Sequence, residues 1–173
     1  MRALVVLLIG VVAFAAGVML GYKLDSDETS AATAPGLPAA VEETRAALLE
    51  AAESGDYEAL RTLIPSDGFE YTFGEPVEDG PVAYWQDLEQ ETDERPLEAL
   101  AAILKMPYVL SRGYYVWPWA YTVESAGHLS RHEQELLEPL GAVDTLFPAE
   151  SGYFGWRTGV TPDGTWAFFV AGD

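Results

Sequence analysis

Residues 3–22 form an uninterrupted run of twenty residues without a charged side chain, directly after Met1 and Arg2. A helix needs about 20 apolar residues to cross the hydrocarbon core of a bilayer, so this run has the length of one membrane span. It constrains the chain more than any other feature, because whatever follows it must fold beside a membrane. The sequence therefore predicts a transmembrane signal anchor over residues 1–24.

A cleaved signal peptide is the alternative, since Arg2 is a positive residue before the apolar run and residues 13–15 (AFA) resemble a small-residue cleavage site. Cleavage there would leave an N-terminus that is still apolar, and the motif at residues 32–34 lies well beyond the run. An uncleaved anchor fits these flanks better. The chain has no cysteine, so a lipid-modified cysteine cannot replace the helix and disulfides are excluded.

The charges beside the anchor predict its orientation. Arg2 and the α-amino group precede it, whereas Lys23 is followed at once by Asp25 and Asp27. The positive-inside rule then places the N-terminus in the cytoplasm and the rest of the chain outside, as in a single-pass membrane protein.

Small residues recur every four positions within the anchor, at Ala13, Gly17 and Gly21. Such a stripe lets two helix backbones approach closely in lipid, so it is a candidate docking face for another membrane protein. The alternative is that Gly and Ala are simply common in membrane helices.

The part outside the anchor is strongly acidic. From Leu24 onward there are seven basic residues against all 28 acidic ones, which leaves a net charge of −21. A surface of this sign disfavours nucleic acid and anionic lipid as partners. It suits cationic partners, divalent ions or a salty medium, or it is only a solvated surface. No cofactor and no metal site is predicted.

Composition divides this part into a linker and one domain. Residues 25–40 are polar, small and proline-containing, as expected of a flexible linker. Residues 41–173 are numerous enough to form one domain with its own core. No internal repeat and no second linker divides them.

Helical periodicity and capping residues predict five helices. The first two, residues 41–53 and 57–64, meet at Gly55-Asp56, and two more are expected at residues 82–90 and 96–106. A fifth begins at Ser130, because Ser130 and Glu133 have the spacing of a capping box.

Strand signals fall in three places. Aromatic residues alternate over residues 69–73, and residues 108–123 are β-like. The runs at 153–160 and 165–170 are joined by a turn sequence, TPDG, and predict a hairpin. The expected class is therefore α+β, with helices packed on an antiparallel sheet.

The opening VEETRAALLEAAESGDYEALRTLI, followed by an aromatic strand, resembles the start of NTF2-like (SnoaL-like) domains. The resemblance covers residues 41–73 and implies two helices lying across a curved sheet, with a concave pocket. That fold carries enzymes, binding proteins and accessory modules alike, so it implies little about use.

The most unusual segment is residues 113–122, GYYVWPWAYT. In an extended conformation Tyr115, Trp117, Trp119 and Tyr121 would share one face and form a platform for sugar rings or a docking surface. Rings at alternate positions also pack into cores, which is the alternative.

Arg157 is the one basic residue in an aromatic strand. It could hold an anionic ligand, or it could stack on a ring and pair with a carboxylate.

Catalytic and metal-binding patterns are weak. His128 and His132 stand four apart, but the helix is expected to begin after His128, and HEQEL lacks the second histidine of a zinc-protease helix. Glu70 and Glu75 are conceivable acid-base partners on a glycan, although two neighbouring carboxylates mean little in so acidic a chain.

The sequence therefore favours a non-catalytic, membrane-anchored extracytoplasmic binding or accessory module. The alternative is a cell-envelope enzyme or a lipid- or sugar-binding protein with a pocket near Arg157, Trp85 and Tyr71.

Overall fold

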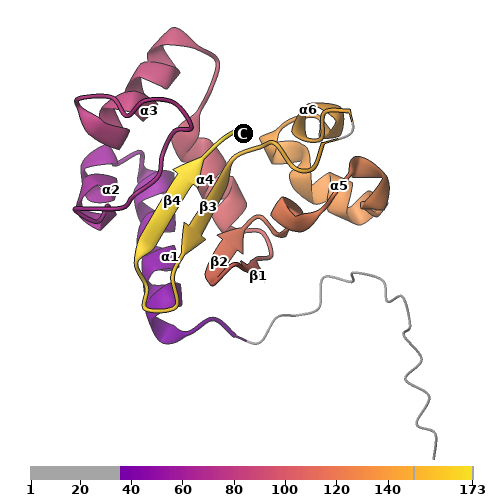
Figure 1. Ribbon diagram of the computed structural model, residues 1–173, viewed down its shortest axis with the longest axis horizontal. Coiled ribbons are helices and arrows are strands. Elements are labelled where there is room, and N and C mark those ends of the chain that lie inside the picture. The colour runs from indigo at the N-terminus through magenta and orange to yellow at the C-terminus, as the bar shows by residue number, and fades with distance from the viewer. Residues whose placement is uncertain (1–35, 150, 173) are drawn as a thin grey trace, which may run out of the picture. The chain divides into compact units, whose positions relative to one another are not determined.

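The computed structural model describes residues 36–149 and 151–172. Within these residues six α-helices pack against a four-stranded antiparallel sheet whose strand order is β1-β2-β3-β4 (Figure 1). The predicted α+β class is confirmed. No helix in this part of the chain has the length and apolarity to cross a membrane. The anchor at 1–24, with Ala13, Gly17 and Gly21, lies outside the described residues, as does most of the linker.

The first two helices are α1 (Ala39–Ser54) and α2 (Tyr57–Leu63), and both were expected. Gly55 ends α1 in the left-handed region, at φ 70°, which a residue without a Cβ adopts at little cost. Asp56 caps α2, because its carboxylate accepts a hydrogen bond from the backbone N–H of Ala59 at 3.0 Å. The Gly-Asp pair thus reverses the chain between the two helices.

Helices α3 (Gly80–Glu91) and α4 (Pro96–Leu104) also form as predicted, each with a proline in its first turn. Helices α1 and α4 pack against each other and against the sheet, and Figure 1 shows them behind β3 and β4. They cover one face of the sheet.

The remaining helices, α5 (Arg131–Leu137) and α6 (Val143–Leu146), lie between the second and third strands in the sequence. The predicted capping box is present: Ser130 Oγ accepts from Glu133 N at 3.3 Å, and Ser130 N donates to the Glu133 carboxylate at 2.8 Å. Short 3₁₀ turns at Trp119–Thr122 (η1), Ala126–His128 (η2) and Glu138–Leu140 (η3) complete this region. It is built around a second hydrophobic cluster that includes Trp119, Leu137 and Phe147.

The sheet consists of β1 (Val109–Ser111), β2 (Tyr114–Trp117), β3 (Arg157–Val160) and β4 (Trp166–Val170). Strands β3 and β4 form the predicted C-terminal hairpin, which closes through a hydrogen bond from Thr161 N to Thr165 O at 2.9 Å. Strand β3 is shorter than expected, since residues 153–156 precede it.

The strand predicted at residues 69–73 is wrong. Only Glu70 joins the sheet, in a one-residue parallel bridge to Phe168. The chain then folds back on itself, because the Tyr71 hydroxyl accepts from Val77 N at 2.9 Å and donates to Val77 O at 3.3 Å. These hydrogen bonds of the Tyr71 side chain compete with further backbone pairing of residues 71–73 along β4. We refer to residues 68–77 as the strap.

The β structure predicted over residues 108–123 is confirmed by β1 and β2, but it does not continue beyond Trp117. Strands β1 and β2 are separated by a tight turn at Arg112-Gly113, with φ values of 50° and 89°. Strand β2 ends at Trp117, where the peptide bond to Pro118 is cis, and η1 follows. Pro118 has no N–H to donate to a ladder, which is why the strand stops there.

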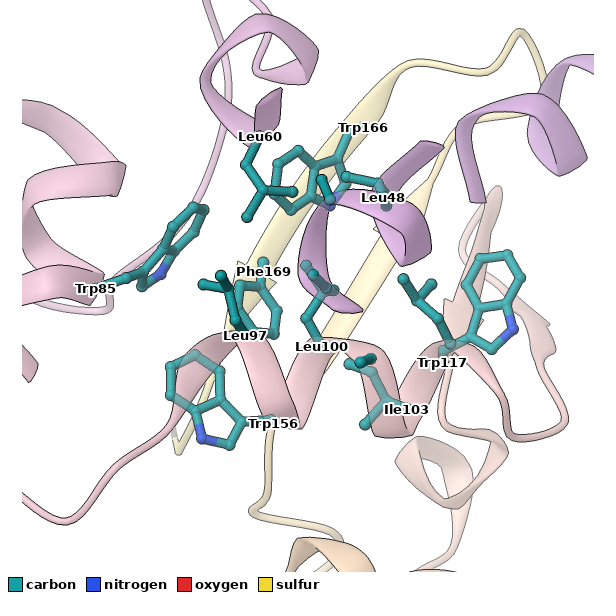
Figure 2. Close-up of a cluster of buried hydrophobic side chains, with 14 of the residues drawn as sticks. Leu48, Leu60, Trp85, Leu97, Leu100, Ile103, Trp117, Trp156, Trp166 and Phe169 are labelled. Carbon is teal, nitrogen blue, oxygen red and sulfur yellow. The ribbon is translucent and has the colours of Figure 1, made fainter. Parts of the chain in front are cut away.

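The main core lies between the helices and the sheet. Figure 2 shows leucine side chains of α1, α2 and α4 meeting Trp85 from α3, Trp117 from β2, and Trp166 and Phe169 from β4. The Trp85 ring centroid lies 5.3 Å from that of Phe169 and 5.8 Å from that of Trp166. These contacts fill the space between α3 and the sheet with aromatic rings.

Candidate functional site

The two faces of the sheet have different surroundings. Strand alternation turns Trp117, Thr158 and Phe169 toward the helices, whereas their neighbours along each strand point the other way. We call this second side the outer face; its residues are Val109, Ser111, Tyr114, Val116, Arg157, Gly159, Phe168 and Val170. Neither α1 nor α4 covers it. The strap and η1 cover part of it instead, since Phe73 and Tyr121 lie against the guanidinium of Arg157.

A pocket of about 230 Å³ lies on the outer face. The β1–β2 turn forms one wall and the start of the strap forms the opposite one, with η1 alongside. The residues lining this outer-face pocket are Gly68, Glu70, Ser111, Arg112, Tyr114, Val116, Tyr121, Ala167 and Phe168.

Three of the nine residues that line the pocket are aromatic: Tyr114, Tyr121 and Phe168. The rings of Tyr114 and Phe168 meet edge to face, with centroids 5.7 Å apart. Phe168 lies directly over Gly159, where a Cβ would collide with its ring. Glycine at this position therefore lets the Phe168 ring settle against the backbone of β3.

Arg112, which lines the pocket, has an unfavourable backbone conformation. Its φ of 50° is the left-handed region, and it is the one non-glycine residue of the described chain with a positive φ. Such a conformation costs a residue with a Cβ roughly 1 kcal/mol, and Asn, Asp or Gly would adopt it more readily. The turn thus carries a long cationic side chain at a position that favours a small residue.

Glu70 reaches the pocket from the opposite wall. Its backbone is fixed by two hydrogen bonds to β4, from Glu70 N to Ala167 O at 3.1 Å and from Phe169 N to Glu70 O at 2.9 Å. No ion pair joins Glu70 to Arg112, both of which belong to the described part of the chain. The pocket therefore presents one carboxylate and one guanidinium on separate walls.

Arg157 lies on the same face but is only 7% exposed. Its guanidinium carbon is 5.2 Å from the centroid of the Phe73 ring and 5.7 Å from that of Tyr121, and Nη1 donates to Gly155 O at 3.5 Å. The ring stacking considered for Arg157 is therefore present. Burial raises the pKa of the nearby Tyr153 phenol, and the charge of Arg157 opposes this in part.

The four aromatic residues predicted to share one face do not do so. Trp117 belongs to the main core and Trp119 to the second cluster, at 1% and 6% exposure. Tyr115 packs against the main core, with its ring centroid 5.6 Å from that of Tyr108. Only Tyr121 lines the outer-face pocket. The break at Pro118 separates the four rings, because alternation holds only along a continuous strand.

The pocket expected near Arg157, Trp85 and Tyr71 is also not formed by those residues together. Trp85 and Tyr71 are buried in the main core on the helix side of the sheet. Arg157 points to the outer face, as the register of Arg157 with Val170 and of Thr158 with Phe169 requires. The sheet itself separates Arg157 from Trp85.

A second cavity, of about 390 Å³, lies between the start of α4 and η3. It is bordered by Asp93, Glu94 and Glu98, and Trp156 Nε1 donates to Glu94 Oε2 at 2.9 Å. His128 and His132 are exposed, and no group of three metal-ligating side chains occurs among the described residues.

Sequence reasoning missed most of the outer-face pocket. Glu70 was considered only as an acid-base partner of Glu75, which does not line the pocket, and Arg112 was not singled out. The available signal was Arg112-Gly113 between two β-like runs, because a glycine there indicates a tight hairpin turn.

No protein family, curated protein or solved structure matches this chain.

Proposed function

We propose that this protein is a membrane-anchored, extracytoplasmic binding module, and that the outer-face pocket is its binding site. The observation that carries the proposal is the pocket itself, which is lined by three aromatic rings and by two unlike charges on the sheet face that points away from α1 and α4. A concave surface that combines aromatic rings with a few charged and polar groups is typical of ligand sites.

The lining residues favour binding over catalysis. A guanidinium stays protonated in proteins, so Arg112 can hold a ligand but does not exchange protons with it. Glu70 is exposed and belongs to the wall of the pocket, where it can accept hydrogen bonds from a ligand. Neither residue requires a reaction to explain its position.

The size of the pocket limits the ligand. Its 230 Å³ is below the roughly 300–1,000 Å³ of sites for drug-sized molecules. We therefore expect it to accept a small molecule, a headgroup or one side chain of a partner.

The predicted anchor supports the membrane attachment in this proposal. The uncharged run at residues 3–22 and the positive charge before it support a single-pass protein with its folded domain outside the cytoplasm. The stripe Ala13, Gly17 and Gly21 would let the same helix pack against a second membrane protein. The domain would then act as an accessory subunit of a membrane complex.

Photo-crosslinking in the cells that make the protein tests the site. A photoreactive amino acid is placed at Ser111, in the pocket wall, or at Arg61, on the exposed surface of α2. After irradiation, the intact mass of the purified full-length chain reports adducts of small ligands and of proteins alike. We expect a discrete adduct at Ser111 that Arg61 does not give. The same adduct pattern at both positions would refute a binding site in the pocket.

A further inference from the structure

The residues that line the outer-face pocket point to a small zwitterion as its ligand, that is, a molecule that carries both an ammonium group and a carboxylate or phosphate. This inference rests on the proposed function and specifies the ligand class of the same site. It follows from which groups line the two walls and the floor.

The first wall offers a group for an oxyanion. Arg112 belongs to a turn whose φ of 50° disfavours its own side chain, so the local backbone does not explain why an arginine is there. Its guanidinium presents a planar set of donors that matches a carboxylate or a phosphate bidentately.

The second wall and the floor offer groups for a cation. Glu70 is fixed to β4 through its backbone and carries a carboxylate that accepts from an ammonium group. The rings of Tyr114 and Phe168 line the same pocket, and aromatic faces attract cations. Together these groups resemble the surroundings that proteins provide for ammonium ligands.

Charge balance then selects among ligand classes. A ligand that covers the pocket removes water from both charges, and a charge that loses water needs a partner. A neutral ligand compensates neither charge, a cation leaves Arg112 unpaired, and an anion leaves Glu70 unpaired in an acidic domain. A zwitterion compensates both, and the absence of an ion pair between Glu70 and Arg112 leaves both groups available to it.

Two sources supply this chemistry beside a membrane: free amino acids, and the ethanolamine phosphate headgroups of phospholipids. The full-length chain is therefore placed in nanodiscs of phosphatidylglycerol alone, which carry no zwitterionic headgroup. Calorimetric titrations with L-leucine and with glycerophosphoethanolamine test the two sources. Acetate, glycerol phosphate and ethanolamine supply the separate halves of these molecules.

We expect at least one of the two zwitterions to bind at least tenfold more tightly than any half-molecule. Binding of both would support the inference, and binding of only one would also identify the source. Arg112→Asn and Glu70→Gln should each weaken binding at least tenfold. The matched changes Arg131→Gln on α5 and Glu50→Gln on α1, both exposed and outside the pocket, should alter it less than twofold.

Arg112→Asn also separates binding from folding. Asparagine accepts a positive φ, so this variant should unfold at the same temperature as the parent or higher while it loses affinity. Equal binding of a half-molecule, or unchanged affinity in Arg112→Asn, would overturn the inference. If no zwitterion binds but the Ser111 adduct persists, the ligand class is wrong and the proposed function stands. If no zwitterion binds and no adduct forms at Ser111, both the ligand class and the proposed function are wrong.

Discussion

A single buried hydroxyl links the two strands of the C-terminal hairpin. Thr158 Oγ1 accepts from the indole Nε1 of Trp166 at 2.7 Å and donates to the backbone oxygen of Phe168 at 2.7 Å. Thr158 is fully buried and Trp166 is 1% exposed, so water cannot replace the bond between their side chains. We therefore expect Thr158→Val, which keeps the shape of the side chain, to destabilise the domain.

The magnitude follows from the two bonds. An indole N–H left buried without an acceptor costs about 1–3 kcal/mol, and the lost bond to Phe168 O about 0.5–1.5 kcal/mol more. The methyl group that replaces the hydroxyl recovers about 0.8 kcal/mol of apolar burial. The free energy of unfolding should therefore fall by about 2 kcal/mol, which corresponds to a midpoint about 1 M lower in urea.

Urea unfolding of the domain from residue 36 onward, followed by far-UV circular dichroism, measures this change. Trp166→Phe supplies the control, because it removes the N–H that Thr158→Val leaves unpaired. In the Trp166→Phe background the cost of Thr158→Val should shrink by about 1–2 kcal/mol. An equal cost in both backgrounds would show that the indole bond does not carry the effect.

Three further predictions concern other parts of the molecule. Asp56→Ala should cost about 1 kcal/mol in urea unfolding because α2 loses its N-cap bond, whereas Asp56→Asn should cost little; equal losses would contradict this. Burial raises the pKa of Tyr153, so the stability from its neutral phenol is fully present below the unfolded pKa of about 10 and declines as pH rises above it. Unfolding measured between pH 8 and about 11 should show a shallower decline in Tyr153→Phe, and parallel curves would refute this role. A phosphatase reporter fused after Asp173 should be active, whereas a cytoplasmic reporter active there would reverse the proposed topology.

Local signals predicted the helices well. The Gly55-Asp56 reversal, the prolines that begin α3 and α4, and the Ser130–Glu133 capping box act over a few residues, so their geometry follows from neighbours in the chain. The C-terminal hairpin was also predictable, because its turn sequence lies between two runs with strand character. Each of these signals acts between residues close together in the chain, so the sequence alone is enough to predict its effect.

The strands and the candidate site depended on contacts between distant segments. Residues 69–73 alternate as a strand does, yet Tyr71 binds Val77 and only Glu70 pairs with β4. The four aromatic residues from Tyr115 to Tyr121 alternate as well, but the break at Pro118 sends Trp117 and Trp119 into different clusters. Alternation reports which side chains are apolar, and it does not report whether the backbone stays extended.

The sequence by itself therefore determined the α+β class, the placement of α1 to α5, the hairpin and the acidic charge of the chain, because periodicity, capping and charge are local or additive properties. It did not predict α6. Only the tertiary structure decided which face of the sheet the helices cover, and so which side chains are left to form a pocket. Glu70 and Arg112 are separated by the α3 and α4 helices in the chain, and the four-stranded pairing together with the strap places them on opposite walls. A juxtaposition of this kind depends on strand order and register, which are set by the packing of the whole core.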